Sequence, residues 1–314
     1  MNQNLDFTGI EVLVIGDIML DKHIWGNVQR LNPEAPALLI DVTHENYAPG
    51  GAANTAKNIA SLGGKVSVLG VIGEDDAGKQ LKQELEKRNV NIEYIISQQD
   101  IPTIQKVRAY AQHQQLLRFD YEKKNAVSQE SSDTFKDILR SALPKTDIVV
   151  VSDYAKGVVK REIMESLKRY NKKVILDPKP SNKDAYTRVY LMTPNAKEAC
   201  ELAGADYLSK PDYEDIGNLL KNQYQSNILI TRGSKGMQLF SESKQSFQIP
   251  TMAKDVYDVT GAGDTVVAVL AMSIAKGYSL EESATLANAA AGVVVGKLGA
   301  ACISIDELND ALSY

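Results

Sequence analysis

The stretch of sequence that best suits chemistry is DVTGAGDT, residues 258–265. Glycines just before a helix leave backbone N–H groups free to bind an anion, and the helix dipole adds to that preference. Such donors would come from Gly261, Ala262 and Gly263. Asp264 follows directly, and a carboxylate there can accept the proton of an attacking hydroxyl. The pattern predicts a phosphoryl-binding anion hole with Asp264 as general base. The alternative is an aspartate that only caps the helix.

Six further polar residues lie at or just after the ends of apolar, β-branched segments. They are Asp17, Asp153, Asp177, Lys179, Asn195 and Thr231. Ligands of open parallel sheets bind beyond the carboxyl ends of the strands. We therefore expect these six side chains to gather on one rim, although each alone could cap a helix or bind a turn.

A second glycine-rich segment, PGGAANTAKNIASLGG, spans residues 49–64. Gly50 and Gly51 precede a predicted helix, and Asn54 lies one turn into it. Paired glycines let the backbone approach a polar ligand closely, and Asn54 would point at that ligand. A tight turn with small-residue packing explains the same glycines equally well.

Two loops have the composition of a nucleotide and metal site. TRGSKGM, residues 231–237, follows a strand and carries two glycines, so it either lines a nucleotide or turns a hairpin. In TPNAKEA, residues 193–199, Asn195 and Glu198 share one face of a helix start. Glu198 could act on Mg²⁺ through water, because Mg²⁺ keeps much of its hydration shell. A glutamate favoured by the helix dipole is the alternative.

Basic residues gather in one predicted strand pair. Lys106 and Arg108 are two residues apart, so they point to one face of a strand, and Arg118 lies on the next strand. They predict either a clamp for an anionic group or a solvated basic face.

Several common sites are excluded by the sequence. His23, His44 and His113 have no metal-ligand spacing. No G-x-x-x-x-G-K-[ST] motif occurs, and no G-x-G-x-x-G follows a strand. A nucleotide site must therefore be of another kind.

The elements that would position these residues alternate in type. Strands are predicted at 12–17, 66–73, 147–154, 173–179, 189–195 and 227–233. Helical periodicity runs through 52–63, 77–89, 160–171 and 196–204, and two apolar helices are predicted at 264–277 and 279–299. Strands alternating with helices predict an α/β fold, a three-layer α/β/α sandwich with a mostly parallel central sheet.

Two segments, about 18–48 and 100–121, break this alternation. The second alternates like antiparallel strands. We interpret both as a small β lid on a single domain that covers residues 1–314.

The composition is that of an ordinary globular protein, with 314 residues, 44% hydrophobic and 24% charged. The net charge of −5 argues against nucleic acid as the main partner. There is no signal-peptide pattern and no apolar run of ~18 residues. Without such a run we expect no membrane partner. The two cysteines, Cys200 and Cys302, lie far apart, which favours a reduced, cytoplasmic protein.

These motifs together resemble the ribokinase (PfkB) family of sugar kinases. DVTGAGD is similar to the C-terminal signature of that family, with Val259 and Thr260 departing slightly from its commonest order. PGGAANTAKNIASLG resembles its N-terminal glycine signature, and NAKE its N-x-x-E motif. The resemblance covers essentially the whole chain. It implies a ribokinase-like fold and an ATP-dependent sugar kinase with Mg²⁺.

Further segments resemble the members of this family that act on heptose 7-phosphate. They include VIGDIMLDKHIWGNVQRLNPEAP, PTIQKVRAYAQHQQLLRFDYE, VVVSDYAKGVV, ILDPK and LANAAAGVVVGKLG. The resemblance implies phosphorylation of D-glycero-D-manno-heptose 7-phosphate at the anomeric hydroxyl, on the route to ADP-heptose and lipopolysaccharide. Many relatives are fused to a nucleotidyltransferase. Because no HxGH motif follows the kinase here, we expect a stand-alone kinase or a separated kinase part. A kinase for another sugar or nucleoside, or a non-catalytic sensor, are the alternatives.

The resemblance also implies roles for single residues. Asp264 matches the catalytic base, and the anion hole matches Gly261, Ala262 and Gly263. The ATP and Mg²⁺ motif matches Asn195, Ala196, Lys197 and Glu198. Nucleotide-lining positions match Thr231, Gly233, Gly236 and Asn288. Sugar-binding positions match Asp17, Gly50, Gly51 and Asn54. Candidates for phosphate and lid contacts are Lys106, Arg108, Asp153, Lys156 and Lys179. Some members bind K⁺, for which Asp258 is the expected neighbour, and the lid often forms a homodimer interface.

Overall fold

The computed structural model describes residues 4–28, 32–112, 114–123, 127–209, 211–242, 245–253 and 255–313. Its strands are β1 Glu11–Gly16, β2 Ile18–Asn27, β3 Asp41–Gly51, β4 Lys65–Gly73, β5 Val90–Asn91, β6 Ile95–Gln98, β7 Gln105–Ala111, β8 Gln114–Tyr121, β9 Ile148–Ser152, β10 Lys173–Asp177, β11 Leu191–Met192, β12 Asn227–Thr231, β13 Met237–Phe240 and β14 Phe247–Ile249. Its α-helices are α1 Ala52–Ser61, α2 Asp76–Glu86, α3 Gln129–Ala142, α4 Arg161–Lys168, α5 Ala196–Ala203, α6 Tyr213–Tyr224, α7 Ala262–Lys276, α8 Leu280–Val294 and α9 Ile305–Leu312. Short 3-10 turns are Leu143–Lys145, Pro180–Ala185, Tyr207–Ser209 and Gly233–Lys235.

The main sheet has the order β14-β13-β12-β11-β10-β9-β1-β4-β5, with β6 also paired to β4. Every pair from β5 to β12 is parallel, and only β12–β13 and β13–β14 are antiparallel. The strands are buried on both faces, which explains their continuous β-branched runs. The mostly parallel sheet predicted from the sequence is confirmed.

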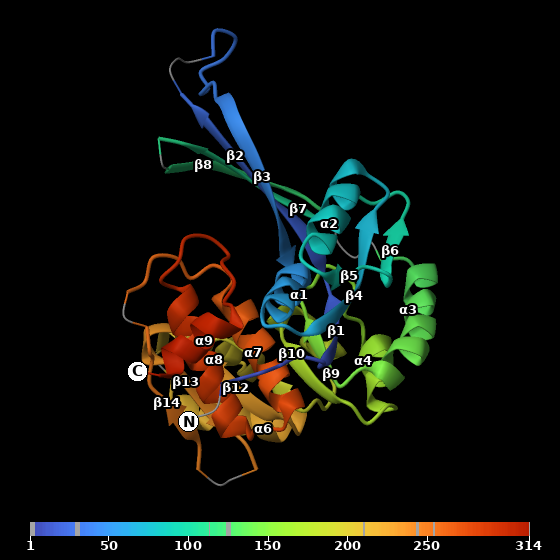
Figure 1. Cartoon of the computed structure of the whole chain (residues 1–314), viewed down its shortest axis with the longest axis vertical. Helices are drawn as coiled ribbons and strands as arrows, with labels where there is room; N and C mark the ends of the chain where they lie inside the picture. Colours follow the sequence, from blue (N-terminus) through green and yellow to red (C-terminus); the bar gives the residue numbers. More distant parts are fainter. Residues whose placement is uncertain are drawn as a thin grey trace.

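Helices cover both faces of this sheet (Figure 1). One face packs against α1, α2, α7, α8 and α9, through residues such as Val14, Val68 and Ala268. The other packs against α3, α4, α5 and α6, through residues such as Leu13, Val149 and Phe135. The three-layer sandwich is therefore confirmed. The first face is built largely from small residues of α1, α7 and α8, which lets those helices lie close together.

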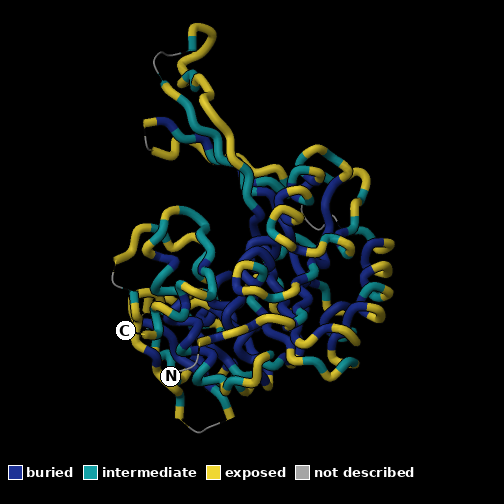
Figure 2. Tube along the Cα trace, in the orientation of Figure 1, coloured by how far each residue is buried: buried dark blue, intermediate teal, exposed yellow. Residues whose placement is uncertain are grey.

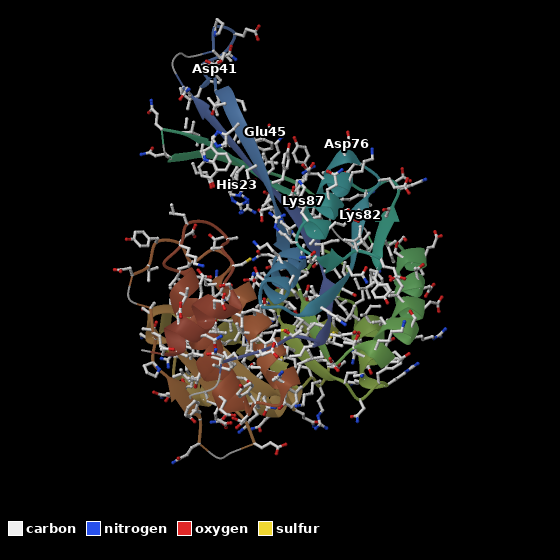
Figure 3. All side chains as sticks on the ribbon, in the orientation of Figure 1. His23, Asp41, Glu45, Asp76, Lys82 and Lys87 are labelled. Carbon is white, nitrogen blue, oxygen red and sulfur yellow. The ribbon has the colours of Figure 1, made fainter. Side chains whose placement is uncertain are left out.

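A four-stranded sheet, in the order β3-β2-β7-β8, projects from the main body (Figure 1). It begins one residue after β1, so it rises from the carboxyl-end edge of the main sheet. Most of β3 and all of β8 are exposed, β7 keeps buried residues such as Ala109 and Ala111, and most buried residues lie in the body (Figure 2). His23 and Glu45 lie along this lid and Asp41 near its outer end (Figure 3). The pairing of β7 with β8 is antiparallel as predicted, but β2 and β7 are parallel.

Some helix boundaries were predicted wrongly, and some helices were not predicted. The last long predicted helix, 279–299, ends as α8 at Val294, five residues early. The helices α3, α6 and α9 were not predicted. Their residues outside a narrow apolar stripe are polar, which gives a weaker signal than the buried helices give. His113, one of the three histidines without metal-ligand spacing, lies outside the described residues. No described helix is long and apolar enough to cross a membrane.

Candidate active site

Five of the six polar residues at the strand ends line one cavity, and the sixth, Asp17, binds the loop after β9. A cavity of about 160 Å³ is lined by Asp153, Asp177, Lys179, Asn195 and Thr231 from the ends of β9 to β12. Gly263 and Tyr154 line the same cavity. The GAGD turn, distant in sequence, is thus brought to the carboxyl-end rim of the sheet, where parallel sheets bind ligands.

Asp264 lies in the first turn of α7, and its carboxylate is buried. Oδ2 accepts a hydrogen bond of 2.6 Å from Asn54 Nδ2. Oδ1 accepts one of 2.8 Å from Thr55 Oγ1 and one of 3.3 Å from the Tyr154 hydroxyl. No capping hydrogen bond from a side chain exists at this helix start, because the N-cap residue is Gly261. The alternative that Asp264 merely caps the helix is therefore excluded by its geometry.

Burial raises the pKa of Asp264, and the hydrogen bonds from Asn54, Thr55 and Tyr154 act in the opposite direction. An ionised carboxylate offers about four lone-pair positions, of which three are taken. One position is left for a proton donor, so the side chain is held in place and still able to act as a base.

Asn54 contributes a second unused group to this site. Its Nδ2 must point at Asp264, because a carboxylate only accepts hydrogen bonds. Its Oδ1 is therefore directed elsewhere, and it is buried with no hydrogen-bond partner among the described residues. A buried acceptor without a donor is costly, and a hydroxyl of a bound ligand would satisfy it.

The GAGD turn supplies a slightly different anion hole from the one predicted. Ala262 N–H donates to the carbonyl of Val259 and is not free, which corrects its predicted role. Among the described residues, the N–H groups of Gly261, Gly263 and Asp264 have no hydrogen-bond partner. Gly261 has φ 78°, and a Cβ there would lie 3.0 Å from Asn54 Nδ2. Glycine is thus required at 261 by backbone shape and by close packing.

Asp17 has partners that differ from the predicted sugar. Its carboxylate is buried and accepts hydrogen bonds from the backbone N–H groups of Tyr154, Lys156 and Val158. Burial raises the pKa of Asp17 to about 6. Asp17 thus holds the loop after β9, and this loop carries Tyr154 and Lys156 to the site; the predicted contact of Asp17 with a sugar stays a prediction.

Asp153 is likewise held by protein groups. It accepts hydrogen bonds from Ala155 N–H, Asn182 Nδ2 and the Tyr186 hydroxyl. It therefore supports the rim of the site, and its predicted contact with a phosphate stays a prediction.

The glycines before α1 are explained by close packing. A Cβ on Gly50 would lie 2.3 Å from Asp21 Oδ2. Gly51 has φ 56°, and a Cβ there would lie 2.4 Å from the carbonyl oxygen of Asp17. The tight-turn alternative accounts for both residues, and their contact with a sugar stays a prediction.

Asn195 and Glu198 form a capping box at the start of α5. The Asn195 side chain accepts from Glu198 N–H, and Glu198 Oε2 accepts from Asn195 N–H. Glu198 Oε1 also lies 3.3 Å from Lys179 Nζ. Lys197 is exposed and pairs with Glu201 at 3.7 Å. Glu198 and Asn195 both line the cavity, whereas Ala196 and Lys197 do not.

The predicted nucleotide loop forms the hairpin between β12 and β13. Thr231 lines the cavity and bridges Asn195 of the neighbouring strand end. Gly236 has φ 75°, and a Cβ there would lie 1.9 Å from the carbonyl oxygen of Ile249, so glycine is needed for packing. Gly233 has φ 56° with open space around it. Asn288 is buried and donates to the carbonyl of Pro250, and it is not among the residues that line this cavity.

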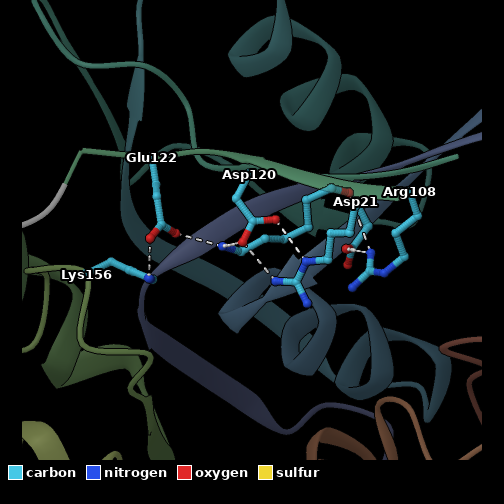
Figure 4. Close-up of polar contacts among 7 residues, drawn as sticks. Asp21, Arg108, Asp120, Glu122 and Lys156 are labelled. Carbon is cyan, nitrogen blue, oxygen red and sulfur yellow. Dashed lines mark hydrogen bonds and ion pairs between the residues drawn. The ribbon is translucent and has the colours of Figure 1, made fainter. Parts of the chain in front are cut away.

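The basic residues of the lid are paired with carboxylates (Figure 4). Lys106 contacts Asp120 and Glu122 at 2.8 and 2.7 Å, and Arg108 contacts Asp21. A hydrogen bond from Arg118 is the main cause that lowers the pKa of Asp120 to about 2. The predicted common face is present, but it is a network of ion pairs rather than a set of free cations. The alternative of a solvated basic face does not describe these paired side chains, and the predicted clamp for an anionic group stays a prediction.

Asp258 fixes the start of the GAGD turn. Its two oxygens accept hydrogen bonds from Thr260 N–H and Gly299 N–H. The Thr260 side chain is the main cause that lowers the pKa of Asp258, and these two N–H groups add to the effect. No group of three His, Cys, Asp or Glu side chains that could hold a metal occurs in the described part of the chain.

Several residues of the site were not predicted from the sequence. Thr55 and Tyr154 contact Asp264, and Asp21 pairs with Arg108. Tyr154 follows the strand-end Asp153, so its position in the sequence could have indicated a place at the site. Nothing in the sequence indicated a role for Thr55, because a threonine beside Asn54 in a helix is ordinary.

Comparisons with known proteins agree with this geometry. The model of the pfkB family of carbohydrate kinases matches residues 10–306. Bifunctional protein HldE of Sulfurimonas denitrificans is 42% identical over 306 residues, 95% of this chain and 63% of that protein. Its counterpart in Vibrio parahaemolyticus is 42% identical over 311 residues, with 98% and 64% covered. The chain thus spans less than two thirds of the length of these relatives.

The fold also has solved neighbours. A ribokinase of Thermotoga maritima superimposes with a TM-score of 0.76 at 22% identity, covering 97% of this chain and 99% of that one. Phosphofructokinase-2 of Escherichia coli in complex with fructose-6-phosphate does so with 0.76 at 21%, covering 97% and 98%. At this identity the likeness establishes the ribokinase-like fold.

Proposed function

Because this chain belongs to the pfkB family of carbohydrate kinases, we propose that it transfers a phosphoryl group from ATP to a heptose 7-phosphate. The acceptor would be the anomeric hydroxyl of D-glycero-D-manno-heptose 7-phosphate, and the product heptose 1,7-bisphosphate. This reaction belongs to the synthesis of ADP-heptose for lipopolysaccharide, and we assign it to the cytoplasm. The identity of 40–42% to several HldE proteins supports the choice of sugar.

The observation that carries the proposal is the setting of Asp264. A buried carboxylate with three fixed donors and one free lone-pair position lies beside three unpaired N–H groups. Asp264 would take the proton of the acceptor hydroxyl, while the N–H groups of Gly261, Gly263 and Asp264 would stabilise charge on the transferred group. Asn54 Oδ1 would accept a hydrogen bond from a neighbouring sugar hydroxyl. The sugar and the base would then be oriented by the same amide.

The cavity also suits a divalent cation held with a nucleotide. Burial raises the pKa of Asp177 well above its ordinary value, and the charges of Glu198 and Asp264 add to this effect. Among the described residues, its one side-chain hydrogen bond is from Thr193 Oγ1 at 3.3 Å. Asp177 and Glu198 would hold Mg²⁺, partly through water, with phosphate oxygens supplying further ligands. Bound Mg²⁺ would neutralise the developing negative charge.

The nucleotide would lie beside Thr231, Asn195 and Gly233. We propose no contact between ATP and Asn288, whose side chain amide is already engaged by Pro250. Asp258 stays the proposed neighbour of a K⁺ ion, as a support of the turn, since its oxygens are both engaged. One solved neighbour, phosphofructokinase-2 of Escherichia coli, is a complex with potassium.

A second candidate is a kinase for an unphosphorylated sugar or a nucleoside. It is favoured by one observation: Lys106 and Arg108 are already neutralised by carboxylates of the same chain. A non-catalytic sensor is disfavoured, because a binding module has no need of a carboxylate held like that of Asp264.

The lid supports a homodimer. All of β8 is exposed, and Leu117, Phe119 and Tyr121 alternate along it on the face opposite Arg118. An exposed apolar strand at a sheet edge is a surface that proteins normally cover. We propose that a second copy of this chain covers it.

The function is tested with a panel of acceptors, ATP and Mg²⁺, followed by ³¹P NMR. Heptose 7-phosphate should give a new anomeric phosphate resonance faster than fructose 6-phosphate or ribose. Preferential turnover of either of the latter would reject the heptose and favour the second candidate. No turnover of any acceptor would favour the sensor.

A further inference from the structure

Glu122, the residue after β8, joins the lid to the main body. Its Oε2 accepts a hydrogen bond of 2.7 Å from Lys106 Nζ on β7. Its Oε1 accepts one of 2.8 Å from Lys156 Nζ, in the loop after β9 (Figure 4). The three side chains are between 10% and 21% exposed, so solvent screens these pairs less than it screens ordinary surface pairs.

The charge around Glu122 is nearly balanced. The cations are Lys106, Arg108, Arg118 and Lys156, and the carboxylates are Asp21, Asp120 and Glu122. Four cations and three carboxylates leave one net positive charge. If a phosphate dianion took the place of Glu122, the cluster would become neutral. Exchange of the carboxylate for a phosphate is therefore favoured over simple addition of a phosphate.

We propose that Glu122 occupies the phosphate subsite of the free protein, and that the phosphate of the substrate displaces it from Lys106 and Lys156. Two phosphate oxygens accept from the two ammonium groups as the two carboxylate oxygens do. The Glu122 carboxylate then competes with the substrate phosphate for Lys106 and Lys156. This competition raises the KM of phosphorylated substrates and excludes substrates that carry less negative charge. It also explains why a phosphate clamp is fully paired in the free protein. The inference rests on the proposed function for the identity of the sugar.

The position of this subsite suits a sugar that is phosphorylated far from its reacting hydroxyl. Lys156 lies two residues after Tyr154, so their α-carbons are within roughly 7 Å of each other. Tyr154 contacts Asp264, whereas Lys156 contacts Glu122. Asp17 binds the N–H groups of both residues and fixes their spacing. The base and the phosphate subsite are thus held at the two ends of one short loop.

Binding of inorganic phosphate, measured by isothermal titration calorimetry, tests the proposal. Glu122→Gln should bind phosphate about tenfold more tightly than the parent protein, since a charged competitor is lost. The matched control is Glu45→Gln, because Glu45 pairs with Lys22 at 2.9 Å on the opposite face of the lid. This control should bind phosphate as the parent does. Equal or weaker binding by Glu122→Gln, or no binding by either protein, overturns the proposal.

A second measurement uses the unaltered chain and needs no variant to fold. A carbodiimide joins an ion-paired carboxylate and lysine directly, and mass spectrometry identifies the linked peptides. Coupling of Glu122 to Lys156 or Lys106 should fall in saturating sodium sulfate, while coupling of Glu45 to Lys22 should not. Coupling of Glu122 that does not respond to sulfate, or that responds only as much as the Glu45 pair does, overturns the proposal.

Failure of this inference is distinguishable from failure of the proposed function. Phosphate binding does not depend on turnover. Tighter phosphate binding by Glu122→Gln without turnover of heptose 7-phosphate keeps the subsite and rejects the sugar. Turnover of heptose 7-phosphate with unchanged phosphate binding by Glu122→Gln rejects the subsite and keeps the function.

Discussion

The hydroxyl of Thr55 donates a hydrogen bond of 2.8 Å to Oδ1 of Asp264, although 209 residues separate them in the chain. Both residues are buried, at the starts of α1 and α7. This contact and the one from Asn54 join the two glycine-rich turns into one site. The protein thus holds its proposed base from a neighbouring helix rather than from the turn that carries it.

The Thr55 contact makes a prediction about pH. Burial raises the pKa of Asp264, so kcat/KM should fall on acidification at a pH above that of an ordinary aspartate. The hydrogen bond from Thr55 lowers that pKa. Thr55→Val removes the donor at nearly constant shape, and the acid limb of the pH–rate profile should move to higher pH. Thr146→Val, a buried threonine that donates to Ala142, should leave the limb in place. An acid limb that moves to lower pH in Thr55→Val contradicts the assignment.

The lid cations predict a change confined to one substrate. In Lys106→Ala with Arg108→Ala, the carboxylates of Asp21, Asp120 and Glu122 lose cationic partners and repel an anion. The KM for the sugar phosphate should rise by about two orders of magnitude, and the KM for ATP far less. Steady-state kinetics in both substrates check this. Lys22→Ala, on the other face of the lid, should change neither, and an equal rise in both values would remove these residues from the sugar subsite.

Gly51 predicts a loss of stability that is independent of chemistry. Gly51→Ala places a Cβ at a positive φ and 2.4 Å from the carbonyl oxygen of Asp17. The free energy of unfolding should fall by about 3 kcal/mol, from backbone strain and a steric clash together. Gly63→Ala also has a positive φ, 88°, but open space around it, and should cost only about 1 kcal/mol. Urea denaturation of the two variants measures the difference, and equal losses would show that the clash is relieved elsewhere.

The exposed face of β8 predicts a change in oligomeric state. Phe119→Asp would place a charge in the proposed interface, and sedimentation velocity should then detect monomer where the parent protein is a dimer. Leu219 is also exposed, at 48%, but it lies on α6 in the main body. Leu219→Asp should remain dimeric. A dimer that persists in Phe119→Asp would move the interface away from this face.

The main sheet and the rim of the site could be predicted because their signals are local. A buried parallel strand is a run of β-branched residues, and the residue that ends it reaches the rim whatever lies between the strands. The helix start at Gly261 could be predicted because its signal is also local. A turn with φ 78° before an apolar helix favours glycine.

Hydrogen-bond partners could not be predicted in this way. Asp17 accepts three backbone N–H groups from a loop about 140 residues further along the chain, and nothing near Asp17 in the sequence indicates that loop. The same holds for Lys106, whose carboxylate partners depend on the register of β7 against β8. A charged residue at a predicted site can bind a ligand or support the structure. Only its partners in the folded structure distinguish these two roles.

The most direct test of the account is the rate of phosphoryl transfer by Asp264→Asn in a single turnover, with nucleotide binding measured in parallel. Asparagine has nearly the same size as aspartate, and its Oδ1 can still accept from Thr55 and Tyr154. It cannot accept the proton of the acceptor hydroxyl. If Asp264 is the base, nucleotide binding should stay close to that of the parent protein, and the transfer rate should be lower by several orders of magnitude. A transfer rate near that of the parent protein would contradict the assignment of Asp264 as the base.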